Sequence, residues 1–235
     1  MPDWNLALNL ARLVLVASDL GTGTYGQPQF DAISALGYTF LEEIKGNDLP
    51  GDAVSFGYVA ISPAKEAVCA IRGTHATDIL EWLDDAAAVL IPTRLGMVHA
   101  GFWGVYESLK SKEVTVADYL LALMDSNLAS CVTIAGHSLG GSLATLLARD
   151  LVTLDIRIRT FASPRTGDKN FADAFNELVP HSERYEHHVD IVPMLPTYPF
   201  WHVGQKIRLS GDDSLSVAAN HELTTYVKLL EAKVS

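Results

Sequence analysis

A glycine-flanked serine, set between a strand pattern and a helix pattern, constrains the fold of this chain more than any other feature. Gly136–Gly140 reads Gly-His-Ser-Leu-Gly, with Ser138 at its centre. The preceding run, Cys131–Ala135, is apolar and partly β-branched, and the leucines that follow recur at helical spacing. This context indicates a nucleophile elbow, whose serine backbone is strained and whose hydroxyl stands clear of the sheet. We expect the flanking glycines where a Cβ would collide with neighbouring backbone. The alternative interpretation is an ordinary glycine-rich loop.

Length and charge limit the domain count and the classes of partner. The chain has 235 residues and neither a linker-like stretch nor an internal repeat, so we expect a single domain spanning residues 1–235. Its 17 lysines and arginines stand against 28 acidic residues, a net charge of -11. A charge of this sign repels phosphate backbones and anionic headgroups, so we expect no nucleic-acid partner.

The cysteines and the hydropathy pattern bear on cofactors and compartment. Cys69 and Cys131 lie in apolar runs that we interpret as strands, so we predict two buried free thiols. Their spacing indicates neither a disulfide framework nor a metal site, and we expect no cofactor. The sequence has no signal-peptide pattern and no run of the roughly eighteen apolar residues that a membrane span requires. We therefore expect a soluble protein, made without export or with its leader removed; compartment and oligomeric state stay open.

Periodic patterns along the chain predict an α/β architecture. Helices are expected over 4–19, 101–124 with a break near 111–115, the stretch after Ser138, 171–178 and 223–232. Strands are expected over 55–62, 67–72, 131–135, 156–161, 183–188 and 206–209, while 28–50 reads as mixed and turn-rich. Because strand, helix and strand in succession normally pair in parallel, we expect a mostly parallel central sheet covered by helices on both faces. Site residues should gather at the carboxyl ends of its strands.

A nucleophilic serine needs a histidine that accepts its proton and a carboxylate that orients the histidine. In a fold with this elbow, the acid and then the histidine follow the serine. The three histidines at positions 181–188 follow too soon to leave room for an acid-bearing strand and a return loop. His221 lies in a polar segment just before the terminal helix, which we interpret as a loop that holds the base. His202 remains the alternative base.

Asp190 is the predicted acid. It directly follows an expected strand and precedes 191–196, Ile-Val-Pro-Met-Leu-Pro, whose prolines restrict the backbone around the carboxylate. The other acids after the serine fall on helices or in open loops, where we interpret them as solvated charges. The competing interpretation of Asp190 is a turn residue at a strand end.

The oxyanion hole requires two donors aimed at the tetrahedral intermediate. The N–H of the residue after the nucleophile, Leu139, is the first. The second comes from a loop after an early strand, and Arg72-Gly73-Thr74 closes such a strand. Gly73 permits a close approach, and Thr74 offers both an N–H and a hydroxyl.

Six motifs in order resemble the class 3 lipases, the fungal-type triacylglycerol lipase family of the α/β-hydrolase fold. They are Ile71–Thr74, Trp82–Asp85, Val98–Phe102, Thr133–Gly141, Thr160–Arg165 with Gly167, and Asp190–Pro196. The resemblance implies a serine carboxylic-ester hydrolase that cleaves acylglycerols through an acyl-enzyme. It implies Ser138 as nucleophile, Asp190 as acid and His221 as base, with Thr74 and Leu139 in the oxyanion hole, the same set that the residue order selects.

Several activities occur in similar folds. Carboxylesterase, phospholipase A1 and feruloyl esterase activities therefore remain alternatives, and a catalytically silent lipase-like binding module is the alternative from a different class. The complete triad disfavours that module. Secreted members of the family often carry disulfides and a leader, and this chain has neither, which leaves export open.

Residues 76–91 are predicted to form a lid over the serine. At helical spacing Ile79, Trp82 and Leu83 share one face, while acidic residues occupy another. The pattern alone favours an ordinary surface helix. The position beside the oxyanion loop and the family resemblance, which implies a Trp-bearing lid opening at a lipid–water interface, favour the lid.

Overall fold

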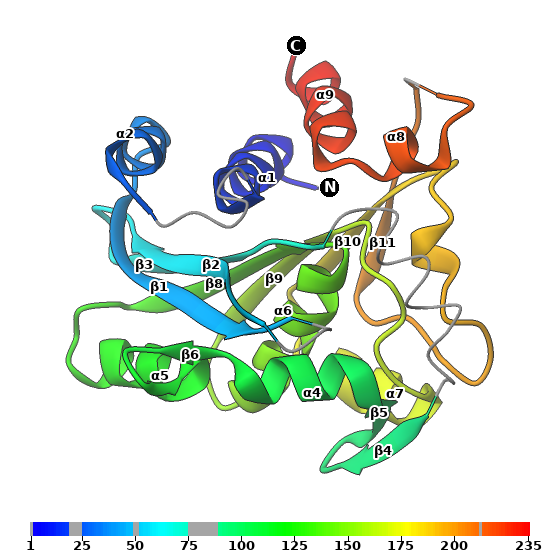
Figure 1. The fold of residues 1–235 in the computed structure, drawn as a ribbon, viewed down its shortest axis with the longest axis horizontal. Coiled ribbons are helices and arrows are strands. Elements are labelled where there is room, and N and C mark those ends of the chain that lie inside the picture. The colour runs from blue at the N-terminus through cyan, green and yellow to red at the C-terminus, as the bar shows by residue number, and fades with distance from the viewer. Residues whose placement is uncertain (1, 19–24, 49–51, 75–88, 212) are drawn as a thin grey trace.

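The computed structural model describes residues 2–18, 25–48, 52–74, 89–211 and 213–235. Nine strands form one sheet through the middle of the molecule (Figure 1). In spatial order they are β11 (Gln205–Leu209), β10 (Ser182–His187), β9 (Ile156–Phe161), β8 (Cys131–His137), β3 (Glu66–Ile71), β2 (Ala53–Ile61), β1 (Thr39–Asn47), β6 (Lys110–Ser111) and β7 (Val114–Thr115). Two further strands, β4 (Leu90–Thr93) and β5 (Gly96–His99), pair as a separate hairpin.

The part of the sheet that carries the elbow is parallel, which agrees with the predicted parallel central sheet. β3, β8, β9, β10 and β11 pair in parallel with one another in this order along the sheet, reading from β3. The strands on the other side, β2, β1, β6 and β7, pair antiparallel. The connection sets this difference at β2–β3, because the four residues 62–65 are too few for a parallel crossover.

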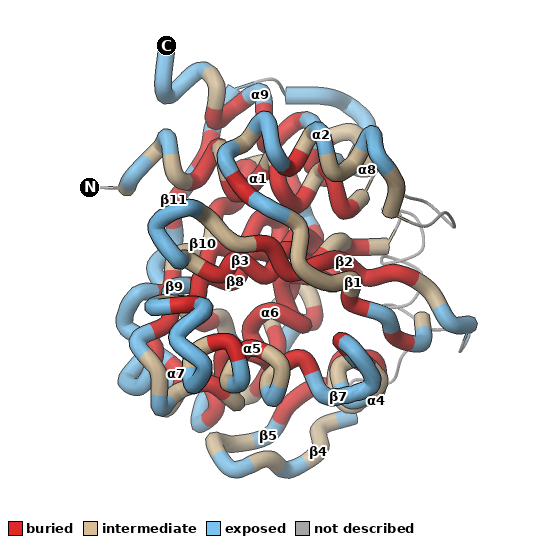
Figure 2. Tube along the Cα trace, turned by 90° about the vertical axis from the view of Figure 1, so that its left-hand side faces the viewer, coloured by how far each residue is buried: buried red, intermediate tan, exposed pale blue. Residues whose placement is uncertain are grey.

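Helices cover both faces of the sheet, as predicted (Figure 1). One face carries α1 (Trp4–Ser18), α2 (Gln27–Ala35), α8 (Val217–His221) and α9 (Leu223–Val234). The opposite face carries α4 (Ala100–Ser108), α5 (Val116–Asp125), α6 (Leu139–Asp150) and α7 (Lys169–Leu178). The sheet therefore has a hydrophobic core on each side, and the buried residues lie between the helical layers (Figure 2).

Several predicted elements need correction. Residues 28–50 hold α2 and β1 rather than turns; charged residues along half-exposed β1 mask strand alternation. The break near 111–115 is a short hairpin, β6–β7, between α4 and α5. Cys69 is a buried free thiol, but Cys131 is only half-buried because it begins β8.

Most of the predicted lid, residues 76–88, lies outside the described residues. Its last two residues, Leu90 and Ile91, do not continue a helix. They belong to β4, which pairs with β5 through Leu90–His99 and Ile91–Val98. Residue 91, the predicted end of the lid, therefore lies in a strand and not in the helix expected there.

Candidate active site

The elbow has the strained geometry that its sequence predicts. Ser138 lies between β8 and α6 with φ 55° and ψ -127°, a conformation that costs a non-glycine residue about 1–3 kcal/mol. A Cβ on Gly136 would lie 2.1 Å from the carbonyl oxygen of Gly140, and a Cβ on Gly140 would lie 2.4 Å from that of Arg72. Both positions therefore require glycine, and the turn holds Ser138 at the carboxyl end of β8.

A serine–histidine–carboxylate relay meets at this turn. His221 Nε2 lies 2.8 Å from Ser138 Oγ, and His221 Nδ1 lies 2.9 Å from Asp190 Oδ2. When Nδ1 donates its hydrogen to Asp190, Nε2 is left to accept the serine proton. Ser138 comes from the turn between β8 and α6, His221 from α8 and Asp190 from the loop after β10, and they are 83 and 31 positions apart along the chain. The structure thus brings together the residues predicted as nucleophile, acid and base.

The relay is closed to solvent. The exposed fractions of Ser138, Asp190 and His221 are 0%, 2% and 1%. His221 was expected in a polar loop, but it is the last residue of α8, whose N-cap Ser216 accepts the Ala219 N–H. Burial within this short helix holds the imidazole in place.

The carboxylate of Asp190 is held by three donors. Its Oδ1 accepts the Val192 N–H at 3.0 Å, and its Oδ2 accepts the Tyr226 hydroxyl at 2.8 Å as well as His221. Burial and the neighbouring Asp190 charge raise the pKa of Tyr226 well above its usual value, so it remains a donor at neutral pH. The sequence did not identify Tyr226 as a donor to Asp190. The available signal was a tyrosine on the terminal helix, whose hydroxyl needs a partner if buried.

His137 contacts His221, the predicted base, and was not identified from the sequence as part of the site. Its Nε2 donates to the His221 carbonyl at 2.8 Å, and the two ring centroids lie 4.9 Å apart. Burial lowers the pKa of His137 to about 3, and electrostatic repulsion from His221 contributes a smaller part of this lowering. His137 is therefore neutral at ordinary pH and does not oppose a positive charge on His221. Its place in the elbow pentapeptide was the sequence signal.

The loop after β3 holds Thr74, one of the two predicted oxyanion donors. A Cβ on Gly73 would lie 2.7 Å from Ser138 Cβ, so this loop packs against Ser138. The next residue, Thr74, has a buried hydroxyl with no hydrogen-bond partner among the described residues. Leu139 is the first residue of α6, and such an N–H has no acceptor within its helix. Arg72 fixes the loop by donating to the carbonyls of Ser55 and Gly73.

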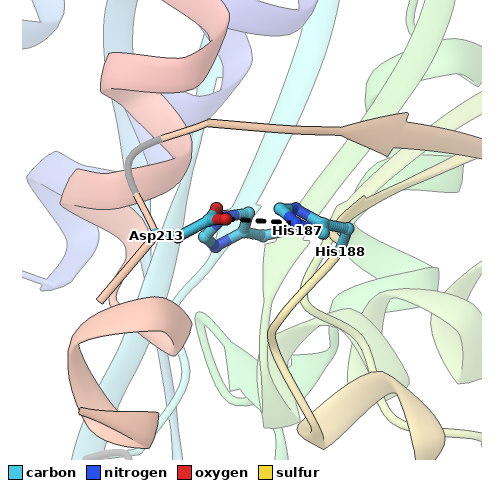
Figure 3. Close-up of side chains that lie close together, drawn as sticks. All are labelled: His187, His188 and Asp213. Carbon is cyan, nitrogen blue, oxygen red and sulfur yellow. Dashed lines mark hydrogen bonds and ion pairs between the residues drawn. The ribbon is translucent and has the colours of Figure 1, made fainter. Parts of the chain in front are cut away.

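The remaining predicted residues lie elsewhere. His202, the alternative base, donates from Nε2 to the Pro193 carbonyl at 2.5 Å and lies 3.5 Å from Glu186. The predicted lid residues Ile79, Trp82 and Leu83 are outside the described residues. Three side chains of types that can bind a metal lie close together elsewhere, namely His187, His188 and Asp213 (Figure 3).

The chain matches a family model over much of its length. The model described as Lipase (class 3) matches residues 68–200, which include the elbow and Asp190. No helix in the part of the chain that the structure describes combines the length and apolar character needed to cross a bilayer.

Several plant proteins and a nematode protein are similar to this chain. A chloroplastic galactolipase of Arabidopsis thaliana, DONGLE, is 28% identical over 77% of this chain and 50% of its own length. Phospholipase A1-II 3 of Oryza sativa subsp. indica is 31% identical over 67% of this chain and 47% of its own. Lipase ZK262.3 of Caenorhabditis elegans is 33% identical over 60% of this chain and 41% of its own. The chain thus spans about half the length of the curated relatives it matches.

Solved lipase structures share the fold. The Yarrowia lipolytica LIP2 lipase superposes with a TM-score of 0.74 at 21% identity, over 92% of this chain and 83% of that one. A triacylglycerol lipase whose catalytic centre is described as a serine protease triad superposes with a TM-score of 0.69 at 21% identity, over 88% of this chain and 79% of that one. At such identities the similarity shows only a shared fold, which is that of the α/β-hydrolases.

Proposed function

Since the chain belongs to the class 3 lipase family, we propose that it is a serine hydrolase that cleaves the carboxylic esters of acylglycerols. The observation that carries the proposal is the continuous relay from Ser138 Oγ through His221 to Asp190, with contacts of 2.8 and 2.9 Å. Such a relay is the arrangement that serine acyl transfer uses, which supports the proposal. A silent binding module would have no need to keep a buried, strained serine in register with a histidine and an acid.

The first half of the reaction forms an acyl-enzyme. Ser138 Oγ attacks the ester carbonyl carbon while His221 Nε2 takes the hydroxyl proton. The carbonyl oxygen becomes an oxyanion and accepts hydrogen bonds from the Leu139 N–H and from Thr74. When the intermediate collapses, the C–O bond to the alcohol breaks, and His221 returns the proton to the departing alkoxide.

The second half releases the acid. His221 takes a proton from water, the hydroxide attacks the acyl carbon, and the bond to Ser138 Oγ breaks with the proton returned to the serine. Asp190 stabilises the imidazolium in both halves without taking its proton. The products are a fatty acid and an alcohol-bearing glycerolipid, and no cofactor takes part.

Glycerolipids with a polar headgroup are the favoured substrate subclass after neutral acylglycerols. Several relatives bear the names galactolipase or phospholipase A1. These names support a glycerolipid with a polar headgroup as the substrate. The net charge of -11 disfavours anionic bilayers, so uncharged or zwitterionic headgroups fit this chain better. Carboxylesterase and feruloyl esterase activities have no supporting observation beyond the shared fold.

The predicted lid is part of this proposal. The relay is buried, so access must open for any substrate, and residues 76–88 follow the oxyanion loop directly in the chain. Exposing Ile79, Trp82 and Leu83 would be unfavourable in water and favourable at a lipid surface. The proposal therefore includes activation at an interface.

A substrate panel tests the proposal. Fatty-acid release should be followed by titration at constant pH on emulsified triacylglycerol, phosphatidylcholine and galactolipid, with soluble p-nitrophenyl butyrate as the short-chain reference. We expect glycerolipid hydrolysis that disappears in Ser138→Ala. If the folded wild-type protein hydrolyses only the soluble ester, it is a carboxylesterase. If it hydrolyses no ester in the panel, the binding-module alternative holds instead.

A further inference from the structure

A cluster of two histidines and an aspartate takes no part in the proposed relay. His187 ends β10, His188 follows it, and Asp213 comes from the loop after β11 (Figure 3). His187 Nε2 lies 3.3 Å from Asp213 Oδ1, and His188 Nε2 lies 3.3 Å from Asp213 Oδ2. One ligand atom from each residue lies within 4.8 Å of the other two. Two imidazoles and a carboxylate thus converge on one point.

We propose that His187, His188 and Asp213 bind one divalent transition metal of the Zn²⁺ type. Imidazole nitrogen and carboxylate oxygen are ligands that Zn²⁺ accepts, with bonds of about 2.0–2.2 Å. Two such bonds at a roughly tetrahedral angle place their ligand atoms about 3.4 Å apart. His187 Nε2 lies 3.3 Å from Oδ1 of Asp213 and His188 Nε2 lies 3.3 Å from Oδ2, so the carboxylate would bind through both oxygens to match this spacing. Mg²⁺ and Ca²⁺ favour all-oxygen sites, so the two histidines discriminate against them.

The surroundings of His187 suit a positive charge. Its Nδ1 lies 3.2 Å from the Asn220 carbonyl, and its Nε2 lies 2.9 Å from the Gly211 carbonyl as well as near Asp213. All of these neighbours are acceptors, and a neutral imidazole has one N–H. If Nδ1 donates to Asn220, the lone pair of Nε2 faces oxygen atoms. A metal bound by Nε2 removes this conflict.

The contact with Asn220 is also the support that metal-binding histidines usually have. A ligating imidazole commonly donates its second N–H to a backbone carbonyl, which fixes the ring and its tautomer. The side chain of His187 is fully buried, so its Nε2 cannot turn toward solvent. Asp213 is about half exposed, which gives a metal ion an entry path and room for a water ligand.

A metal there would tie together the segments that hold the base and the acid. Asn220 donates to the Ser214 carbonyl and accepts the Ser214 N–H, so the loop of Asp213 is fastened to α8 next to His221. The His187 N–H donates to the Tyr226 hydroxyl, which donates to Asp190. Metal bound by His187 and Asp213 would link β10 to the loop before α8 and hold His221 in place.

Metal binding is measured separately from catalysis. Protein freed of metal with EDTA should be titrated calorimetrically with Zn²⁺, and with Ca²⁺ and Mg²⁺ for comparison, at pH 7.5. We expect one Zn²⁺ per chain and no comparable binding of Ca²⁺ or Mg²⁺. Zn²⁺ at about 100 times its Kd should raise the Tm by about 5–10 °C. The effect of metal on ester turnover rests on the proposed function, whereas binding and Tm do not.

Single-residue variants identify the ligands. His188→Gln and Asp213→Asn should each weaken Zn²⁺ binding by at least about 10- to 100-fold. The matched control is His181→Gln, because exposed His181 also lies beside an aspartate, Asp155 at 4.0 Å. It should bind as wild type does. Absence of Zn²⁺ binding by the folded wild type, or equal loss in all three variants, would overturn the proposal. Stabilisation by acid without any metal binding would identify the cation as a proton and overturn it too.

Discussion

Thr74→Val should raise stability and lower activity together. The Thr74 hydroxyl is buried with no hydrogen-bond partner among the described residues, beside a loop that packs on Ser138. Valine keeps the β-branched shape and the backbone N–H and replaces only the hydroxyl with a methyl group. The substitution therefore separates the role of the side chain from that of the backbone.

The two effects have different sizes. A buried polar group without a partner costs about 1–3 kcal/mol, so its removal should increase the free energy of unfolding by about 1 kcal/mol or more. For a chain of this length, that raises the Tm by about 2–4 °C per kcal/mol. Loss of one oxyanion donor should lower kcat by about 10²- to 10³-fold.

Thermal unfolding and hydrolysis of a soluble p-nitrophenyl ester measure both effects in one preparation. Thr133→Val is the matched control, because the buried Thr133 hydroxyl donates to Glu66 at 2.6 Å. It should lose about 1–2 kcal/mol of stability and keep its kcat. An unchanged kcat in Thr74→Val would confine the donor role to the backbone N–H. A fall in its stability would mean that the hydroxyl has a partner in the resting enzyme.

Three further predictions follow from the surroundings of the relay. Tyr226→Phe removes one of three donors to Asp190 and leaves the His187 N–H without its acceptor. We expect kcat to fall about tenfold and the Tm to fall by about 2–12 °C. Wild-type values in both assays would contradict the positioning role. Burial lowers the pKa of His137 to about 3 and that of His202 to about 4, below the value of about 6.5 in the unfolded chain, so they bind fewer protons when folded. Their contribution to stability is present above pH 6.5 and is lost as the pH falls toward 4, and urea unfolding across this range should have a flatter pH dependence in His137→Gln. Trp82→Ser should blunt the rise in activity above the solubility limit of an emulsified ester and leave soluble-ester turnover largely intact; equal effects on both substrates would count against a lid.

The elbow and the relay could be predicted because their chemistry fixes residue type and order. The strained turn at Ser138 needs glycine at fixed offsets, and the acid and base must follow it in a set order. Asp190 could be chosen because a strand end and prolines surround it. The exclusion of 181–188 as bases also agrees with the structure, in which His187 contacts the carbonyls of Gly211 and Asn220.

The supporting residues could not be predicted because their roles depend on tertiary packing. Tyr226 and His137 reach the relay only when α9 and β8 lie side by side with α8, and a sequence pattern says only that both are in apolar segments. α8 is too short for helical periodicity to distinguish it from a loop. The convergence of His187, His188 and Asp213 depends on the path of the chain between β11 and α8, which residue spacing along the sequence does not reveal.

Covalent labelling of the nucleophile tests the central claim most directly. A p-nitrophenyl alkylphosphonate should form one adduct per wild-type chain, located at Ser138 by peptide mass spectrometry. Ser138→Ala should form none, and His221→Ala should react about 10⁴-fold more slowly, while His202→Ala reacts at the wild-type rate. An adduct on another residue, or labelling that depends on His202 and not on His221, would contradict the account.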